Sequence, residues 1–185
     1  NQTILVTGAT GAIGQAICAS LAAEGARVVI HYGRNRAAAE ALLEAIGGRG
    51  TCLSADLSDP AAATALFDAA VTAEGKITGL VNNAGIGTIG AVQKSTVDDE
   101  IRQVRVNVEA VIDLTTRAVQ QMVPRGRGAI LNVGSTAGIR PRPGLTWYNA
   151  SKGWVITADL AESIGEEVSN DLRAIQSIIR ERTGH

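Results

Sequence analysis

Short apolar runs alternate with longer amphipathic stretches along the chain. The apolar runs are rich in β-branched residues and lie at residues 3–7, 27–32, 51–54, 77–81 and 129–134. Runs of this length, bounded by glycine and polar residues, are typical of buried parallel strands. The stretches between them carry a helical pattern at residues 15–23, 37–46, 97–122 and 145–161. This alternation predicts an α/β fold, with a parallel sheet flanked by helices.

Two polar positions refine the helix predictions. Ser58, Asp59 and Pro60 combine a cap residue with a proline, so a helix is predicted to open at this segment. Asn107 lies inside the long stretch 97–122, where its amide competes for backbone hydrogen bonds. We therefore expect a break at Asn107, as a bend or a bound water.

The composition of the chain excludes some classes of protein but does not indicate a function. The chain has 185 residues, 45% hydrophobic content and a net charge of −1, which fits one globular domain and points to no nucleic-acid partner. An 18-residue apolar run and a signal-peptide pattern are both missing, so we expect a cytoplasmic protein without a membrane span. Cys18 and Cys52 are expected to be free thiols, and with only His31 and His185 no metal site is expected.

A glycine-rich turn follows the first apolar run. It reads Gly8-Ala9-Thr10-Gly11-Ala12-Ile13-Gly14 and leads into a helical pattern. Glycines let a backbone approach a pyrophosphate, whose charge the N-terminus of a helix also favours. The turn predicts dinucleotide binding, and a tight turn without a ligand is the alternative.

The second and third strands carry the residues that choose a dinucleotide. A ribose-binding acid is usual after the second strand, but Arg34 stands there instead, which favours the 2′-phosphate of NADP(H) over NAD(H). A solvated Arg34 is the alternative. Asp56 follows the third strand at the ligand edge, where it has either a cofactor role or a capping role. His31 is expected to be a packed or surface residue rather than a catalyst.

Two consecutive asparagines follow the fourth strand, in Asn82-Asn83-Ala84-Gly85. Buried amides are costly unless they have hydrogen-bond partners. Asn82 and Asn83 are therefore expected to tie neighbouring strand ends together or to line a ligand site.

A hydroxyl, a phenol and an ammonium are the candidate catalytic groups. Ser135 lies at the carboxyl end of the fifth strand, and Tyr148 and Lys152 share one face of the last helix by their spacing. An ammonium close to a phenol stabilises the phenolate, which suits acid/base chemistry. The alternative is an amphipathic surface pair. Trp147 is either a wall of the substrate pocket or a packing residue.

Together these motifs resemble the short-chain dehydrogenase/reductase family, in its single-domain branch, over about residues 3–158. The chain is similar to 3-oxoacyl-carrier-protein reductases and to NADP-dependent alcohol and polyol dehydrogenases. The resemblance implies a doubly wound Rossmann-type sheet and hydride transfer between NAD(P)(H) and a carbonyl or alcohol. It rests on motifs in the family's order: Thr7-Gly8 through Gly14, Asp56-Leu57, Asn82 to Gly85, Asn107, Ser135, and Tyr148 with Lys152.

The resemblance also implies a role for each matching residue. Tyr148 is implied as the acid/base, Ser135 as the substrate hydrogen-bond donor, Lys152 as the ligand of the nicotinamide ribose, and Asn107 as the support of a proton-relaying water. The implied cofactor-binding residues are Gly8, Thr10, Gly11, Ile13, Gly14, Arg34, Asp56, Leu57, Asn83, Ala84, Gly85, Tyr148 and Lys152. No metal is implied.

Three features depart from the family. Ala12 occupies the usual middle glycine of the turn, and Gly11 gives a spacing closer to the longer sugar-nucleotide branch. Gly11 also stands where many NADP-preferring relatives carry a basic residue, so the NADP(H) expectation rests largely on Arg34. Residues 159–185 predict a charged helical tail that does not match the family, so the sheet is expected to end at the exposed strand 129–134. Three explanations are open. Residues near 158–172 are left out of this sequence, or the truncation is real and a partner chain covers the edge strand, or the protein no longer turns over substrate. The first is favoured, because a bare apolar edge strand invites aggregation.

The expected function is an NADP(H)-dependent oxidoreductase for a ketone or secondary alcohol, such as a 3-oxoacyl thioester, a small polyol or a sugar. One alternative is an inactive dinucleotide-binding module without a substrate lid, and another is a sugar-nucleotide epimerase or dehydratase. The family resemblance also implies a homodimer or homotetramer, formed through residues 98–123 and 145–165.

Overall fold

All five predicted apolar runs form strands of one parallel sheet. The computed structural model describes residues 2–157. The strands lie in the order β3-β2-β1-β4-β5, and each neighbouring pair is parallel. Their bounds are β1 (Thr3–Val6), β2 (Arg27–Tyr32), β3 (Gly50–Ser54), β4 (Gly79–Asn82) and β5 (Ala129–Asn132). The order reverses between β1 and β4, where α/β folds of this type bind their ligands.

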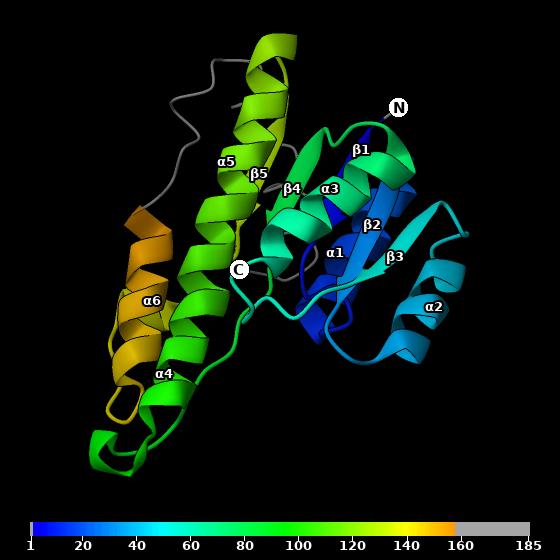
Figure 1. Cartoon of the computed structure of the whole chain (residues 1–185). Helices are drawn as coiled ribbons and strands as arrows, with labels where there is room; N and C mark the ends of the chain where they lie inside the picture. The colour runs from blue at the N-terminus through cyan, green and yellow to red at the C-terminus, as the bar shows by residue number, and fades with distance from the viewer. Residues whose placement is uncertain (1, 158–185) are drawn as a thin grey trace.

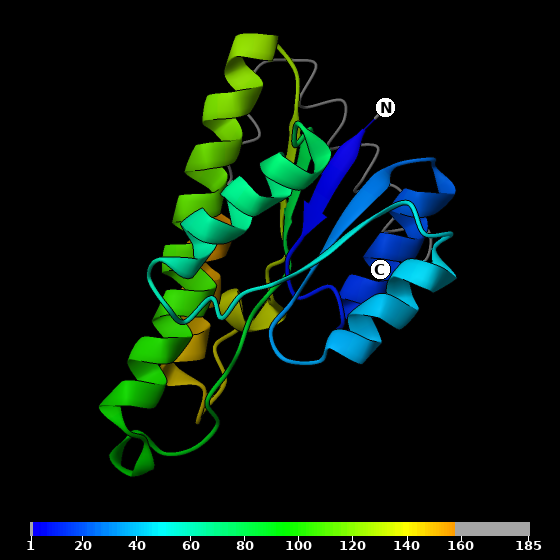
Figure 2. The same ribbon diagram turned by 45° about the vertical axis from the view of Figure 1, so that its right-hand side comes forward.

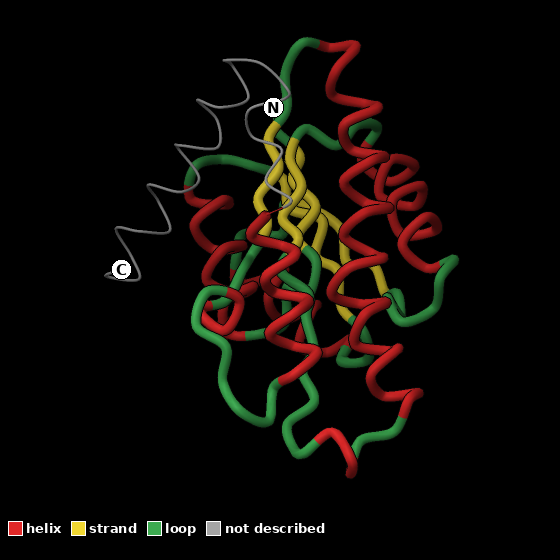
Figure 3. Tube along the Cα trace, turned by 90° about the vertical axis from the view of Figure 1, so that its left-hand side faces the viewer, coloured by secondary structure: helices red, strands yellow, loops and turns green. Residues whose placement is uncertain are grey.

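Helices cover both faces of the sheet (Figure 1). The bounds are α1 (Ala12–Ala23), α2 (Arg36–Ala45), α3 (Ala62–Glu74), α4 (Val97–Val104), α5 (Ala110–Met122) and α6 (Thr146–Thr157). The view in Figure 3 shows the strands in yellow between the helical layers. The doubly wound α/β fold predicted from the sequence is confirmed.

Alternate residues of each central strand fill two separate cores. Ile4 and Val6 of β1 pack with α1 and α2, whereas Leu5 between them packs with α3 and α5. The same alternation holds on β2, where Val29 faces the α3 side. Both faces of the sheet are therefore buried, which explains the continuous apolar runs in the sequence.

The long helix from residue 97 changes its winding in the middle. A π-helical turn, η2 (Arg105–Glu109), joins α4 to α5, and the three segments form one rod (Figure 2). The predicted break at Asn107 is confirmed, and Asn107 is the central residue of this turn. Such turns insert one residue into a helix and are frequent at functional sites.

The predicted start of α3 is wrong. The helix begins at Ala62 with Ala61 as its cap, not at 58–60. The Asp59 carboxylate instead accepts a hydrogen bond from the Ala61 N–H at 3.0 Å, and the Asp56 carboxylate accepts from Ser58. These side-chain bonds hold a tight turn before the helix, because aspartate and serine compete well for backbone donors in turns.

The remaining predictions concern the cysteines, a membrane span, a metal site and the C-terminal residues. Cys18 and Cys52 are free thiols, as expected, and burial raises the pKa of the Cys18 thiol to about 12. Within residues 2–157, no helix is long and apolar enough to cross a membrane, and no group of side chains has the composition of a metal site. Strand β5 lies at one end of the described sheet. The predictions for residues 158–185 lie outside the described residues.

Candidate active site

The carboxyl ends of β1 and β4 are tied together by side-chain amides and hydroxyls. Asn83 donates from Nδ2 to the carbonyl oxygens of Thr7 and Gly8, at 2.9 and 3.0 Å. The Thr7 hydroxyl accepts from the N–H groups of Asn83 and Ala84, both at 3.0 Å. These bonds fix the loop after β4 against the glycine turn, as the paired asparagines predicted.

Asn82 makes the corresponding tie on the other side of β4. Its Nδ2 donates to Asn132 Oδ1 of β5 at 2.9 Å and to Thr115 Oγ1 of α5 at 3.0 Å. Asn82 and Asn132 are partners in the β4–β5 register. The first alternative for these asparagines, a link between strand ends, is the one that the contacts show.

The glycine turn forms a cradle that side chains would fill. Gly8 has a φ of 61°, and a Cβ on Gly14 would lie 2.5 Å from the Gly8 carbonyl oxygen. Gly11 caps α1 without a side-chain hydrogen bond, so the first N–H groups of the helix are left for a ligand. The side chain of Ile13 is 60% exposed beside this helix start. The turn therefore fits a pyrophosphate, whose charge free amides and a helix N-terminus both favour.

The His31 ring of β2 also supports the glycine turn, a contact that the sequence did not indicate. Its Nδ1 accepts from the Gly8 N–H at 3.1 Å, and its Nε2 lies 3.1 Å from the Ala55 carbonyl oxygen. The two bonds together require a neutral ring, and burial lowers the pKa of His31. His31 is thus a packed residue, as predicted, but one that links the glycine turn to the end of β3.

The residues expected around the adenosine end lie on exposed loops. Arg34 is exposed, and no side-chain hydrogen bond or ion pair of its guanidinium occurs within residues 2–157, whereas Arg36 pairs with Glu40 at 2.7 Å. Asp56 accepts from the Ser58 hydroxyl and N–H, and these bonds lower its pKa. Leu57 is buried in the core beside α3, so only its backbone is available to a base.

Lys152 is buried at the end of β5. Its Nζ donates to the Val133 carbonyl oxygen at 2.8 Å, and only 5% of the residue is exposed. Burial lowers its pKa, and no carboxylate within the described residues pairs with it. The alternative of an amphipathic surface pair with Tyr148 is therefore wrong, because neither the burial nor the contact to β5 belongs to a surface lysine.

Ser135 and Tyr148 stand close to this lysine in the fold. Ser135 caps the short helix η4 (Thr136–Gly138), and its Oγ accepts from the Ala137 N–H at 3.2 Å. This bond leaves the hydroxyl proton of Ser135 available to a substrate oxygen. η4 packs directly on α6, since a Cβ on Gly138 would lie 2.6 Å from the carbonyl carbon of Lys152. The Tyr148 ring lies against Gly87 of the loop after β4.

Asn107 joins this group from the π-helical turn. Its Nδ2 donates to Ser151 Oγ of α6 at 3.0 Å, and its side chain also bonds both backbone groups of Ile86. A Cβ on Gly85 would lie 3.5 Å from Asn107 Oδ1 and 3.4 Å from Lys152 Nζ. Asn107 and Lys152 thus both approach the same face of Gly85 in the β4 loop.

Comparison with known proteins agrees with this arrangement. The profile described as short chain dehydrogenase matches residues 2–176 of the chain. The chain belongs to the short-chain dehydrogenase family. This membership confirms the family resemblance seen in the sequence motifs.

Curated relatives and solved structures show what the chain is similar to. The NADP-dependent (R)-specific alcohol dehydrogenase of Lentilactobacillus kefiri is 40% identical over 157 residues, which cover 83% of this chain and 62% of the relative. The structure of a 3-ketoacyl-(acyl-carrier-protein) reductase from Brucella melitensis complexed with NADH has a TM-score of 0.80 and 37% identity, covering 89% of this chain and 69% of that one. An NAD⁺-bound xylitol dehydrogenase has a TM-score of 0.76, 34% identity and coverages of 84% and 61%. The chain thus spans less than two thirds of the alcohol dehydrogenase that it matches.

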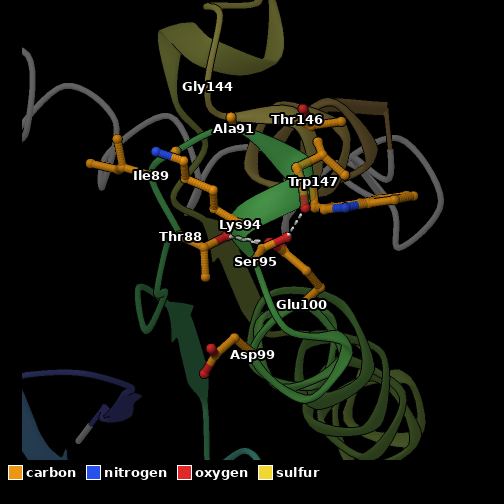
Figure 4. Close-up of a pocket in the computed structure, with 12 residues that line it drawn as sticks. Thr88, Ile89, Ala91, Lys94, Ser95, Asp99, Glu100, Gly144, Thr146 and Trp147 are labelled. Carbon is orange, nitrogen blue, oxygen red and sulfur yellow. Dashed lines mark hydrogen bonds between the residues drawn. The ribbon is translucent and has the colours of Figure 1, made fainter.

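A pocket of about 370 Å³ opens between the loop after β4, the start of α4 and the start of α6. Trp147, the neighbour of Tyr148 in the sequence, is one of its lining residues (Figure 4). That Trp147 walls a substrate pocket stays a prediction. Thr88 donates to the Glu100 carboxylate at 2.9 Å on its wall. Thr88, Glu100 and the neighbouring Gln103 were not candidates from the sequence, because the loop's path past the helix is not visible in any local motif.

Proposed function

We propose that this short-chain dehydrogenase transfers a hydride between NADP(H) and a ketone or secondary alcohol. The observation that carries the proposal is the buried Lys152, one helical turn from Tyr148 and bonded to the end of β5. Burying an ammonium without a carboxylate is unfavourable for folding, so a function must keep it there. The 3-ketoacyl reductase, alcohol dehydrogenase and xylitol dehydrogenase relatives support a carbonyl or alcohol substrate, such as a 3-oxoacyl thioester, a polyol or a sugar.

In this proposal the chain's residues handle the proton and the substrate oxygen. The bound nicotinamide supplies or accepts the hydride. Ser135 donates its free hydroxyl proton to the substrate oxygen, and Tyr148 protonates that oxygen during reduction. Lys152 stabilises the phenolate that Tyr148 then becomes, because its ammonium is held nearby by the Val133 carbonyl. Asn107 positions α6 through Ser151, and supports the relay that returns a proton to Lys152.

The cofactor residues proposed here are those of the cradle and the strand ends. Gly8, Thr10, Gly11, Ile13 and Gly14 meet the pyrophosphate, and Asn83, Ala84 and Gly85 line the cleft beside it. Asp56 and the Leu57 backbone meet the adenine. Arg34 meets a ribose 2′-phosphate, so NADP(H) is preferred over NAD(H), which remains the second cofactor. A homodimer or homotetramer through the rod 97–122 is also proposed, supported by the exposed Ile101 and Ile112 on it.

Oxidation of NADPH by the full-length protein tests the reaction. The substrates are a panel of ketones, 3-oxoacyl thioesters and keto sugars at neutral pH, with Tyr148→Phe beside the wild type. We expect kcat to fall by about 10²–10⁴-fold, the usual contribution of a general acid, with NADPH still bound. Tyr32→Phe removes the same oxygen from the other tyrosine of this sequence and is expected to keep turnover. Binding of NADPH without turnover on any substrate would favour the inactive binding module instead.

Two neighbouring arginines test the cofactor preference. Arg34→Ala is expected to lower kcat/KM for NADPH by about 10–100-fold, the loss of a charged hydrogen bond to phosphate, and to leave NADH unchanged. Arg36→Ala is the matched control, because Arg36 is already paired with Glu40. Equal losses in the two variants, or equal losses with both cofactors, would contradict a phosphate contact by Arg34.

A further inference from the structure

Two amide side chains on the long rod hold the loop that follows β4. Gln103 and Asn107 are one helical turn apart, and they are 0% and 1% exposed. Asn107 accepts from the Ile86 N–H at 2.9 Å and donates to its carbonyl oxygen at 2.8 Å. Gln103 Oε1 accepts from the Thr88 N–H at 2.8 Å. Alternate residues of the loop are thus bonded to successive turns of the rod.

The residue between these two contacts lies against the candidate catalytic tyrosine. Gly87 lies under the Tyr148 ring, where a Cβ would come within 3.0 Å of Cδ2 and 3.4 Å of Cε2. The bonds to the backbone of residues 86 and 88 fix the chain on both sides of Gly87, and so fix where Gly87 lies against the ring. The loop is held between the amides of the rod and the ring of the tyrosine.

From this geometry we propose that Gln103 is a positioning residue for Tyr148, acting through Thr88 and Gly87. The inference rests on the proposed function, in which Tyr148 is the acid. Asn107 holds the start of the loop and also the tyrosine's own helix, through Ser151. Gln103 holds only the far side, where the chain continues into the exposed residues 89–94. On this outer side Gln103 takes the backbone N–H of Thr88, beside the bonds that Glu100 makes to the Thr88 hydroxyl and Gly144 makes to the Gly90 N–H.

The surroundings of Gln103 explain why a glutamine stands there. Its Oε1 takes the Thr88 N–H, and its Nε2 lies 3.5 Å from the Glu100 carboxylate, which also accepts from the Thr88 hydroxyl. An acid at this position would repel Glu100, and an apolar residue would leave the Thr88 N–H without its partner. A buried N–H without a partner is costly, so the loop is expected to move toward water when the amide is lost.

Gln103→Met is the direct test, because methionine is unbranched and of similar length but cannot accept the Thr88 N–H. In the full-length protein we expect kcat to fall by about 10–100-fold, the usual effect of a small misplacement, and the KM for NADPH to stay within about twofold. The double variant Gln103→Glu with Glu100→Gln keeps an acceptor for the Thr88 N–H and a single carboxylate in the pair, so it is expected to recover part of kcat. A loss confined to the KM for NADPH would overturn the proposal.

A second measurement reports the environment of the Tyr148 ring and does not depend on turnover. The protein is labelled with 3-fluorotyrosine, and the ¹⁹F resonance of Tyr148 is assigned by Tyr148→Phe. Gln103→Met is expected to shift or broaden this resonance and to leave that of Tyr32 unchanged. An unchanged Tyr148 resonance would overturn the proposal even if activity fell. If the wild type reduces no substrate, the proposed function fails, but the resonance still decides whether Gln103 positions the ring.

General destabilisation is the competing explanation, and Thr51→Val is its control. Thr51 donates to Glu74 at 2.6 Å in a part of the molecule that does not contact the loop. The control is expected to lower the melting temperature with little change in kcat or in the Tyr148 resonance. If Thr51→Val and Gln103→Met lower the melting temperature equally and also lower kcat equally, Gln103 has only a structural role and the proposal is overturned.

Discussion

At the scale of single residues, Lys152 shows what the spacing of two residues in the sequence can predict and what it cannot. The spacing of Tyr148 and Lys152 places both on one helix, and this much the sequence predicted. Its burial could not be predicted, because it depends on how close the Val133 carbonyl at the end of β5 comes to α6. The roles of Gln103 and His31 were missed for the same reason, since their partners are backbone groups distant in the chain.

Replacing this lysine is expected to separate stability from function. Lys152→Met removes a buried charge, so we expect the free energy of unfolding to stay level or rise by about 0.5–2 kcal/mol while turnover is lost. The pKa of Lys152 is lowered in the fold, so the wild type gains stability as the pH rises toward 10.5. The advantage of the variant is therefore largest at neutral pH and shrinks at alkaline pH.

Urea unfolding from pH 7 to 10 measures this difference. Lys76→Met is the matched control, because Lys76 is an exposed lysine away from the site, and it is expected to change stability by less than about 0.5 kcal/mol. A clear loss of stability in Lys152→Met at pH 7 would show that the bond to Val133 outweighs the burial of the charge.

At the scale of elements, strands were predicted more closely than helix ends. The apolar runs gave all five strands to within a few residues, because both faces of a buried parallel strand must be apolar. The start of α3 was missed, because aspartate and serine turns before a helix contain the same residues as a cap. The π-helical turn was visible only as a break at Asn107, since its winding depends on the loop and helix that Asn107 contacts.

The contact between η4 and α6 gives a prediction at this scale. A Cβ on Gly138 would meet backbone atoms of α6, the Lys152 carbonyl carbon at 2.6 Å and the Gly153 nitrogen at 2.7 Å. Gly138→Ala must therefore push the two elements apart, and we expect a loss of about 1–3 kcal/mol in stability. Ser135 and Lys152 lie on the two separated elements, so turnover should fall as well.

Gly33→Ala is the matched control for this substitution, because a Cβ there meets nothing within 4 Å. Chemical unfolding compares the two variants, and cofactor titration shows whether binding survives. Equal stability of Gly138→Ala and the wild type would mean that η4 can move away from α6 without cost.

At the scale of the whole molecule, the two ends of the sheet have separate roles. The carboxyl ends carry the candidate site. Near the amino ends, Glu74 of α3 accepts from Arg27 of β2 at 2.6 Å and from Thr51 of β3 at 2.6 Å. These hydrogen bonds lower the pKa of Glu74, and its side chain is 3% exposed. The site could be predicted from motifs, whereas this cluster has no local signal because its three residues come from three elements.

Glu74→Gln is expected to weaken the fold without changing the site. The carboxylate's contribution is present above its ordinary pKa of 4.5 and is lost as the pH falls through the lowered value. We therefore expect a melting temperature lower by about 2–4 °C or more at pH 7, with the difference shrinking below about pH 4.5. Thermal scans at several pH values and an NADPH titration measure both properties. A weaker affinity for NADPH below the melting transition would show that the two ends are coupled.

The π-helical turn at Arg105–Glu109 holds one residue more than an ordinary helical turn. The wider turn takes up this residue, so α4 and α5 face almost as they would in an uninterrupted helix. A deletion of one residue there would restore ordinary winding and leave Gln103 facing Thr88. It would also remove the widened turn from which the Asn107 side chain reaches Ile86 and Ser151. A relative with a single gap inside this turn would keep every residue that touches the reacting groups, and we expect it to have lost the link between the β4 loop and α6.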